Sequence, residues 1–143
     1  MKLGIEFSRK LSLAYESMCK PLCHELKLPQ TAFDILMFLA NNPEFKTARD
    51  IVEVRKLKAN LVSVNIDKLV NKGYLIRKNV EGDRRKVQLL CTDKAQPIIS
   101  RGQQLQEHFV EQLFADIDDA TRQTIFQGMQ QMELNLNLIL EDN

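Results

Sequence analysis

The segment LIRKNVEGDRRKVQLL, residues 75–90, constrains the fold more than any other stretch of the chain. Two runs of β-compatible residues, LIRKNV and KVQLL, flank a polar tip that contains Gly and Asp, and this pattern is typical of a two-stranded hairpin. A lone hairpin is only marginally stable in water. The sequence therefore predicts that other elements hold the hairpin, and that the two adjacent arginines at its tip serve a purpose other than packing.

Four helices are expected before the hairpin. Residues 5–26 carry apolar groups at a spacing of three and four, and residues 31–41 are so apolar that this second helix should be buried on most sides. Thr47 and Asp50 form a capping box for a short third helix. A fourth helix follows the turn RKLK and ends at Gly73, the residue type that best terminates a helix in the left-handed conformation.

The fourth helix has two different faces. Apolar residues fall on one of them, and polar or small residues fall on the other, namely Asn60, Ser63, Val64 and Asp67. A short helix, a turn and a longer helix with a polar outer face have the layout of a helix-turn-helix. Because the hairpin follows directly, the order of elements is that of a winged helix. We therefore predict a mainly α chain with a small β-hairpin wing.

Two further helices are expected after the hairpin. Thr92 caps the fifth, which runs to about Phe114, and acidic residues open the sixth within residues 116–143. The sixth helix has a broad apolar stripe: Ile125, Met129, Met132, Leu134, Leu136, Leu138, Ile139 and Leu140. A single winged helix needs far less apolar surface than the first and last helices offer, so we predict a two-fold homodimer interface. A helical cap within a monomer is the alternative.

Positive charge is concentrated in the middle of the chain, although the net charge is only +1. Residues 46–94 contain 13 Lys or Arg and 6 Asp or Glu, a balance of +7, whereas the remainder contains 7 basic and 13 acidic residues, a balance of −6. This segregation is typical of a nucleic-acid-binding surface, because phosphates require Lys and Arg on one face. A solvated charged face is the alternative.

Hydropathy and cysteine content bear on location. No window approaches the roughly 18 uncharged apolar residues that a membrane span requires. The N-terminus, MKLGIEFSRKLSLAYE, is charged throughout and lacks the apolar core of a signal peptide. Three cysteines make a low and odd count that favours reduced thiols. We therefore expect a cytoplasmic protein without membrane association.

Cys19 and Cys23 lie one helical turn apart in the first helix, with His24 beside them. Because this spacing puts both sulfur atoms on one face, these cysteines and Cys91 are candidate thiol sensors. A zinc site needs more ligands than two cysteines and one histidine, and free cysteine is also an ordinary buried apolar residue. We favour the packing role, and we expect neither a metal nor a cofactor.

Catalytic motifs are missing from the sequence. His24 and His108 are the only histidines and are expected on separate helices, no glycine-rich phosphate loop occurs, and no Ser or Cys lies in a nucleophile motif. We therefore do not expect an enzyme.

The stretch LVSVNIDKLVNKGYLIRKNVEGDRRKVQLLCTDKA resembles the MarR family of transcriptional regulators. The family signature combines a recognition helix ending in Leu-x-x-x-Gly, a strand with Arg, a wing tip with Asp-Arg-Arg and a Thr-capped helix. The matching residues are Leu69, Gly73, Arg77, Asp83, Arg84, Arg85, Thr92, Asp93 and Lys94. The resemblance implies one MarR-like chain over residues 1–143, with a winged helix-turn-helix DNA-binding region at about 31–91 and helical dimerisation regions at 1–28 and 93–143.

The resemblance assigns the hairpin tip to DNA binding. In this family the wing places an arginine in the minor groove, and Arg84 is the matching residue. A narrow minor groove concentrates negative potential, which suits a guanidinium. Asp83 is expected to orient a wing arginine by pairing with it, or to be simply a turn residue. Arg85 and Lys86 are expected to contact phosphates or to hold the hairpin against the helices.

Four outward residues of the recognition helix are expected to enter the major groove: Lys58, Asn60, Ser63 and Val64. Among them, Asn60 could read an adenine edge and Val64 could touch a thymine methyl group. Lys68 and Lys72 are expected to contact phosphates. The alternative is that these positions are merely solvated.

Three positions depart from the family pattern. Lys56 occupies the turn where Gly is usual, Lys58 stands where a capping Ser is common, and Val64 replaces a frequent arginine. The missing arginine changes which bases can be read, but it does not affect the fold.

Together these features predict a sequence-specific transcriptional regulator, a homodimeric repressor that binds a pseudo-palindromic operator in double-stranded DNA. The resemblance implies modulation by a small-molecule effector bound between the dimer helices and the winged region, and a thiol-redox effector is the second candidate. No residue identifies the effector or the operator. The alternative function is a winged-helix protein-protein interaction module without specific DNA binding.

Overall fold

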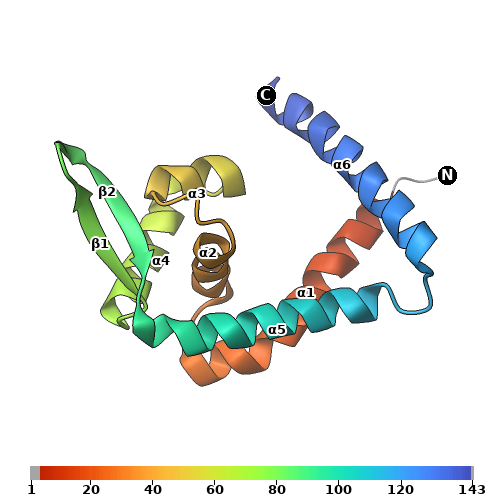
Figure 1. The fold of residues 1–143 in the computed structure, drawn as a ribbon, viewed down its shortest axis with the longest axis horizontal. Helices are drawn as coiled ribbons and strands as arrows, with labels where there is room; N and C mark the ends of the chain where they lie inside the picture. Colours follow the sequence, from red (N-terminus) through yellow and green to blue (C-terminus); the bar gives the residue numbers. More distant parts are fainter. Residues whose placement is uncertain (1–3, 143) are drawn as a thin grey trace. The chain divides into compact units, whose positions relative to one another are not determined.

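The computed structural model describes residues 4–142, so the extreme ends of the predicted terminal regions, residues 1–3 and 143, lie outside the described residues. The elements follow the predicted order (Figure 1). They are α1 (Ile5–Leu26), α2 (Gln30–Asn41), α3 (Ala48–Arg55), α4 (Ala59–Asn71), β1 (Leu75–Val80), β2 (Asp83–Cys91), a short 3₁₀ helix (Asp93–Ala95), α5 (Gln96–Leu113) and α6 (Asp119–Glu141). A mainly helical chain with one antiparallel hairpin confirms the predicted fold class.

The chain divides into two compact units, residues up to Glu107 and residues from His108 onward. The boundary therefore falls inside α5. The first unit holds α1 to α4, the hairpin and most of α5, and it contains the whole predicted DNA-binding region at 31–91. The second unit holds the end of α5 and all of α6.

The core of the first unit is built around α2, which is buried on most of its sides as its apolar sequence predicts. Side chains from α3, α4 and the hairpin complete the main cluster, among them Ile51, Val62, Ile66, Leu69, Leu75 and Leu89. A second cluster joins α1 to α2: Cys19, Leu22, Cys23, Phe33 and Met37. Burial of this apolar surface is the main driving force for folding. Because α4 and both strands share one core, the recognition helix and the hairpin are fixed to the same scaffold.

Local sequence signals set the ends of α3 and α4. Thr47 Oγ1 accepts a hydrogen bond from the Asp50 N–H, and Asp50 Oδ2 accepts one from the Thr47 N–H, both at 3.1 Å, which confirms the capping box. The chain leaves α4 through Gly73, whose φ of +80° lies in the left-handed region. The Tyr74 N–H then donates to the Leu69 carbonyl at 2.9 Å, which turns the chain directly into β1.

The hairpin is anchored at its base, as its marginal intrinsic stability requires. Leu75 and Leu89 are buried in the core, and the Leu89 N–H donates to the Lys46 carbonyl at 2.7 Å. The Thr92 hydroxyl donates to the Gly73 carbonyl at 2.5 Å, just beyond the open ends of the two strands. The prediction that other elements hold the hairpin is confirmed.

The tip of the hairpin is irregular. Gly82 makes the turn with a φ of +85°. The strand register is regular up to the pair Asn79 and Val87 and then shifts, so that Val80 pairs with Asp83. The shift places three exposed basic residues in an irregular part of β2: Arg84, Arg85 and Lys86. An irregularity of this kind bends and twists a strand and re-aims its side chains.

Asn65 is a polar residue on the buried side of α4. It is 3% exposed, its Nδ2 donates to the Leu61 carbonyl at 2.8 Å, and its Oδ1 has no hydrogen-bond partner among the described residues. An unpaired buried oxygen costs roughly 1–3 kcal/mol. We expect Asn65→Leu, which branches at the same atom, to raise the free energy of unfolding by about 1 kcal/mol, as measured by urea denaturation.

Asn65→Asp is the control for this prediction. It places a charge at the same position and should lower the free energy of unfolding, because an unpaired buried charge is costly. If Asn65→Leu were also destabilising, the Asn65 oxygen would have to be satisfied in solution, for instance by a buried water.

The second unit is organised around the loop between α5 and α6. Arg122 donates from Nη2 to the Phe114 carbonyl and from Nε to the Ile117 carbonyl, both at 2.8 Å. Asp118 caps α6 by accepting a hydrogen bond from the Thr121 N–H at 2.7 Å. The predicted acidic opening of this helix is therefore confirmed.

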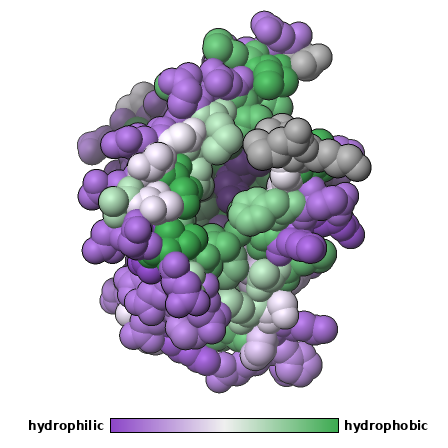
Figure 2. Space-filling model, turned by 90° about the vertical axis from the view of Figure 1, so that its right-hand side faces the viewer, coloured by the Kyte–Doolittle hydropathy of each residue, from purple (hydrophilic) through white to green (hydrophobic). Residues whose placement is uncertain are grey.

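α6 exposes its apolar stripe. None of its described residues is buried. Eight large apolar side chains are 45–60% exposed: Phe126, Met129, Met132, Leu134, Leu136, Leu138, Ile139 and Leu140. Figure 2 shows hydrophobic side chains, coloured green, at the molecular surface. A contiguous apolar surface of this extent is typical of an interaction site.

Candidate nucleic-acid interface

The outward side of α4 is solvent-exposed. Lys58 is the N-cap of this helix and makes no side-chain capping hydrogen bond. The predicted base-reading residues are all exposed: Lys58, Asn60, Ser63 and Val64. The predicted phosphate contact Lys68 is exposed as well. In the turn before the helix, Lys56 takes a left-handed conformation with φ +55°, the conformation for which Gly is usual. The helix-turn-helix therefore presents a continuous accessible face.

Lys72 differs from the other predicted DNA contacts. It is half-buried, and its Nζ donates to the Leu26 carbonyl at 3.3 Å. Leu26 is the last residue of α1, and the carbonyl end of a helix attracts cations. The structure thus gives Lys72 a structural partner, and we leave it out of the proposed DNA surface.

Asp83 shapes the wing through the backbone. Its Oδ1 accepts a hydrogen bond from the Arg85 N–H at 2.9 Å, the pattern of an Asx turn. Within the described residues, none of the salt bridges involves Asp83. Asp83 therefore contacts the main chain of Arg85 and not the guanidinium of a wing arginine. This hydrogen bond fixes the main chain on both sides of Arg84.

An ion pair between Arg77 of β1 and Asp67 of α4 joins the wing to the recognition helix. Sequence reasoning placed Asp67 on the outward face and Arg77 in the family signature, but it did not pair them. The sequence signal that could have paired them is that two outward residues of opposite charge lie on consecutive elements. Because both side chains are largely exposed, the pair contributes more to the orientation of the wing than to stability.

Lys86 lies close enough to the α3 capping box to influence its charge. Burial raises the pKa of Asp50, but hydrogen bonds from Lys46 and Thr47, together with the charge of Lys86, outweigh burial and hold that pKa below its ordinary value. The Lys86 side chain is also exposed, so this attraction leaves it available to a phosphate.

The three cysteines lie in apolar surroundings. Cys19 and Cys23 are buried between α1 and α2, and Cys91 is half-buried. Burial raises the pKa of all three thiols, that of Cys23 to about 11. Because the thiolate is the reactive form, these thiols are poorly suited to fast oxidation. Their placement favours the packing role.

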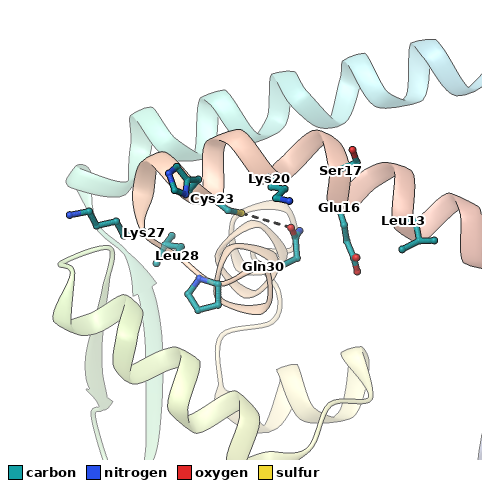
Figure 3. A pocket seen from close by; sticks show the side chains of 10 residues that line it. Leu13, Glu16, Ser17, Lys20, Cys23, Lys27, Leu28 and Gln30 are labelled. Atoms are coloured by element: carbon teal, nitrogen blue, oxygen red, sulfur yellow. Dashed lines mark hydrogen bonds between the residues drawn. The ribbon is translucent and has the colours of Figure 1, made fainter.

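A groove of about 800 Å³ lies beside Cys23, between the second half of α1 and the start of α2 (Figure 3). Cys23 Sγ donates a weak hydrogen bond to Gln30 Oε1 at 3.9 Å. The charged side chains of Glu16, Lys20 and Lys27 line the same groove. Its walls are thus mixed in polarity and open to solvent.

A second cavity, of about 420 Å³, is bounded by α1, α2 and α5 and by Arg55. Gln106 donates to the Tyr15 hydroxyl at 2.9 Å, and Arg55 lies 3.9 Å from the Asp34 carboxylate. Burial raises the pKa of both Tyr15 and Asp34. This cavity combines an aromatic wall with a cation and hydrogen-bonding groups, and its lining is more polar than apolar.

Neither a metal centre nor a membrane span is found in the part of the chain that the structure describes. Over residues 4–142, no three His, Cys, Asp or Glu side chains gather where they could hold a metal ion. Over the same residues, no helix is long and apolar enough to cross a bilayer.

A helix-turn-helix with an exposed outward face, followed by an anchored basic hairpin, defines a winged helix-turn-helix protein. Residues 26–86 match the family model of the MarR family. The match to the MarR family therefore covers the winged helix-turn-helix region of this chain. No curated protein matches the chain significantly.

The whole chain has the fold of solved MarR-family structures. A MarR transcriptional regulator from Methanosarcina mazei superposes with a TM-score of 0.81 at 21% identity, over 94% of this chain and 96% of that one. A MarR family regulator from Listeria monocytogenes, solved with a 26mer DNA, gives 0.85 at 18% identity, over 95% and 90%. BpsR from Bordetella bronchiseptica, whose DNA binding is regulated by 6-hydroxynicotinic acid, gives 0.72 at 17% identity, over 92% and 94%.

Proposed function

We propose that this chain is a sequence-specific DNA-binding transcriptional regulator that acts in the cytoplasm as a homodimeric repressor and has no enzymatic activity. The observation that carries the proposal is the exposed basic surface formed by the outward side of α4 and the irregular tip of β2. This surface lies within the segment of +7 charge, in a chain whose net charge is +1. A basic patch on a winged helix is the electrostatic footprint of DNA binding.

The proposed contacts divide into two groups. Lys58, Asn60, Ser63 and Val64 enter the major groove with the N-terminal half of α4, and Lys68 binds a phosphate. Arg84 enters the adjacent minor groove, while Arg85 and Lys86 bind phosphates beside it. The main-chain contact of Asp83 and the Arg77–Asp67 ion pair set the position of the wing relative to α4.

The proposed dimer uses the exposed apolar side chains of α6, together with those of α1 such as Ile5, Phe7 and Leu13. A second copy of the chain is the proposed occupant, because a two-fold dimer presents two recognition helices to half-sites about one helical turn apart. The expected operator is therefore pseudo-palindromic.

We propose a small-molecule effector as the regulator of DNA affinity. The cavity at Tyr15, Arg55 and Gln106 supports this choice, and it lies in the same unit as the recognition helix. An effector acts only if it binds one spacing of the two recognition helices more tightly than another. The raised pKa of the cysteines makes the thiol-redox effector the weaker candidate.

The salt dependence of DNA binding tests the proposal. A dimer that neutralises six to ten phosphates should lose about 10³-fold or more in affinity between about 50 and 200 mM salt. Fluorescence anisotropy with a labelled duplex measures this loss, and sedimentation gives two chains per duplex. A protein-protein interaction module, the alternative function, would bind no duplex even at the lower salt concentration.

A further inference from the structure

The outward surface of the recognition helix is mostly polar but includes two neighbouring apolar side chains. Leu61 and Val64 are 41% and 51% exposed. They are three residues apart, and side chains at this spacing on a helix lie about 5–6 Å from each other on the same side. Both side chains are hydrated in the free protein, so each gains free energy when an apolar group of a partner covers it.

The same helix offers few groups that read G·C pairs. Guanine is read chiefly by Arg or Lys, and cytosine by an acidic acceptor. No arginine occurs in α4, residues 59–71, and its lysine, Lys68, lies in the last turn. Asp67, the acidic residue of α4, is engaged by Arg77. Lys58 at the N-cap and Lys56 in the preceding turn are the exposed lysines near the end of the helix that enters the groove first.

We propose that Leu61 and Val64 select A·T base pairs by packing against the C5-methyl groups of thymines, so that each half-site carries thymines on neighbouring base pairs. Successive base pairs rise by about 3.4 Å, and methyl groups on nearby pairs can therefore match the spacing of the two side chains. Thymine is the base that presents a methyl group in the major groove. The inference rests on the proposed function and specifies the class of DNA sequence that it binds.

Uracil in place of thymine tests this inference, because uracil keeps the base-pairing edge and O4 and lacks only the methyl group. Operator duplexes obtained by selection from random DNA are remade with uracil at each thymine of one half-site. The wild-type protein should lose roughly fourfold in affinity for each contacted methyl group, the effect of one buried CH₂-sized group. Val64→Ala should bind the thymine operator more weakly than the wild type does. When the thymine that Val64 contacts is replaced by uracil, the affinity of this variant should fall little further.

Val54→Ala is the matched control. Val54 is a valine of similar exposure, 45%, but it lies on α3, outside the recognition helix. This variant should keep the full sensitivity to uracil. Equal wild-type affinity for thymine and uracil duplexes, or a selected half-site rich in G·C, would overturn the inference while DNA binding stands. Failure to bind any duplex would overturn the proposed function itself, so the two failures are distinguishable.

Discussion

Replacing Arg84 with alanine is expected to weaken operator binding by roughly tenfold or more, about 1.4 kcal/mol, without unfolding the protein. Arg84 is exposed in the irregular part of β2, so its truncation removes no packing. What is lost is a guanidinium in a groove of concentrated negative potential. Fluorescence anisotropy on a labelled operator duplex measures the affinity, and circular dichroism verifies the fold.

Arg101→Ala is the matched control for the wing. Arg101 is an exposed arginine of α5 that pairs with Glu25 at 2.5 Å, and it is not part of the proposed DNA surface. This variant should bind operator like the wild type. Arg84→Lys should recover only part of the loss, because an ammonium is more strongly hydrated than a guanidinium. Wild-type affinity in Arg84→Ala would remove the wing tip from the DNA-binding surface.

Removal of the last 20 residues, 124–143, is expected to convert the proposed dimer into monomer or aggregate. The deletion takes away all eight of the large apolar side chains that α6 exposes, and with them the surface that a second copy of the chain is proposed to cover. A milder test places two charges in the stripe, Leu136→Glu with Ile139→Glu. It should shift the sedimentation coefficient to that of a monomer, because buried unpaired carboxylates are costly.

Gln123→Glu with Gln127→Glu is the control for the charge effect. These exposed residues lie about half a turn around α6 from Leu136 and Ile139, and Leu134 and Leu138, which share their side of the helix, lie seven or more residues further along. The control adds the same two charges and should remain dimeric. A truncated chain that stays dimeric and still binds DNA would place the dimer interface elsewhere.

The elements of this fold follow from local patterns in the sequence. The capping box at Thr47, the left-handed exit at Gly73 and the two strands around Gly82 are short-range signals, and each is found in the structure. The apolar character of α2 likewise predicts its burial. Signals of this kind need only neighbouring residues, so a single sequence reveals them.

The finer geometry of the candidate site depends on residues that are distant in the chain. Lys72 contacts the Leu26 carbonyl across 46 positions, and no local pattern distinguishes it from Lys68, which remains exposed. The register shift beside Arg84 follows from the pairing of two strands. The division of the chain into two compact units, which falls inside α5, follows from how residues far apart in the chain pack together. Leu61 was not among the predicted site residues, because its exposure is a property of the packed fold.

Selection of bound sequences from a random pool of duplex DNA, at about 50 and 200 mM salt, tests the proposed function most directly. A homodimeric winged-helix regulator should enrich a pseudo-palindrome whose half-sites lie about one helical turn apart, and the enrichment should fall steeply at the higher salt concentration. Recovery of no sequence above background at either salt concentration would contradict DNA recognition and leave the protein-protein interaction module as the function of this winged helix.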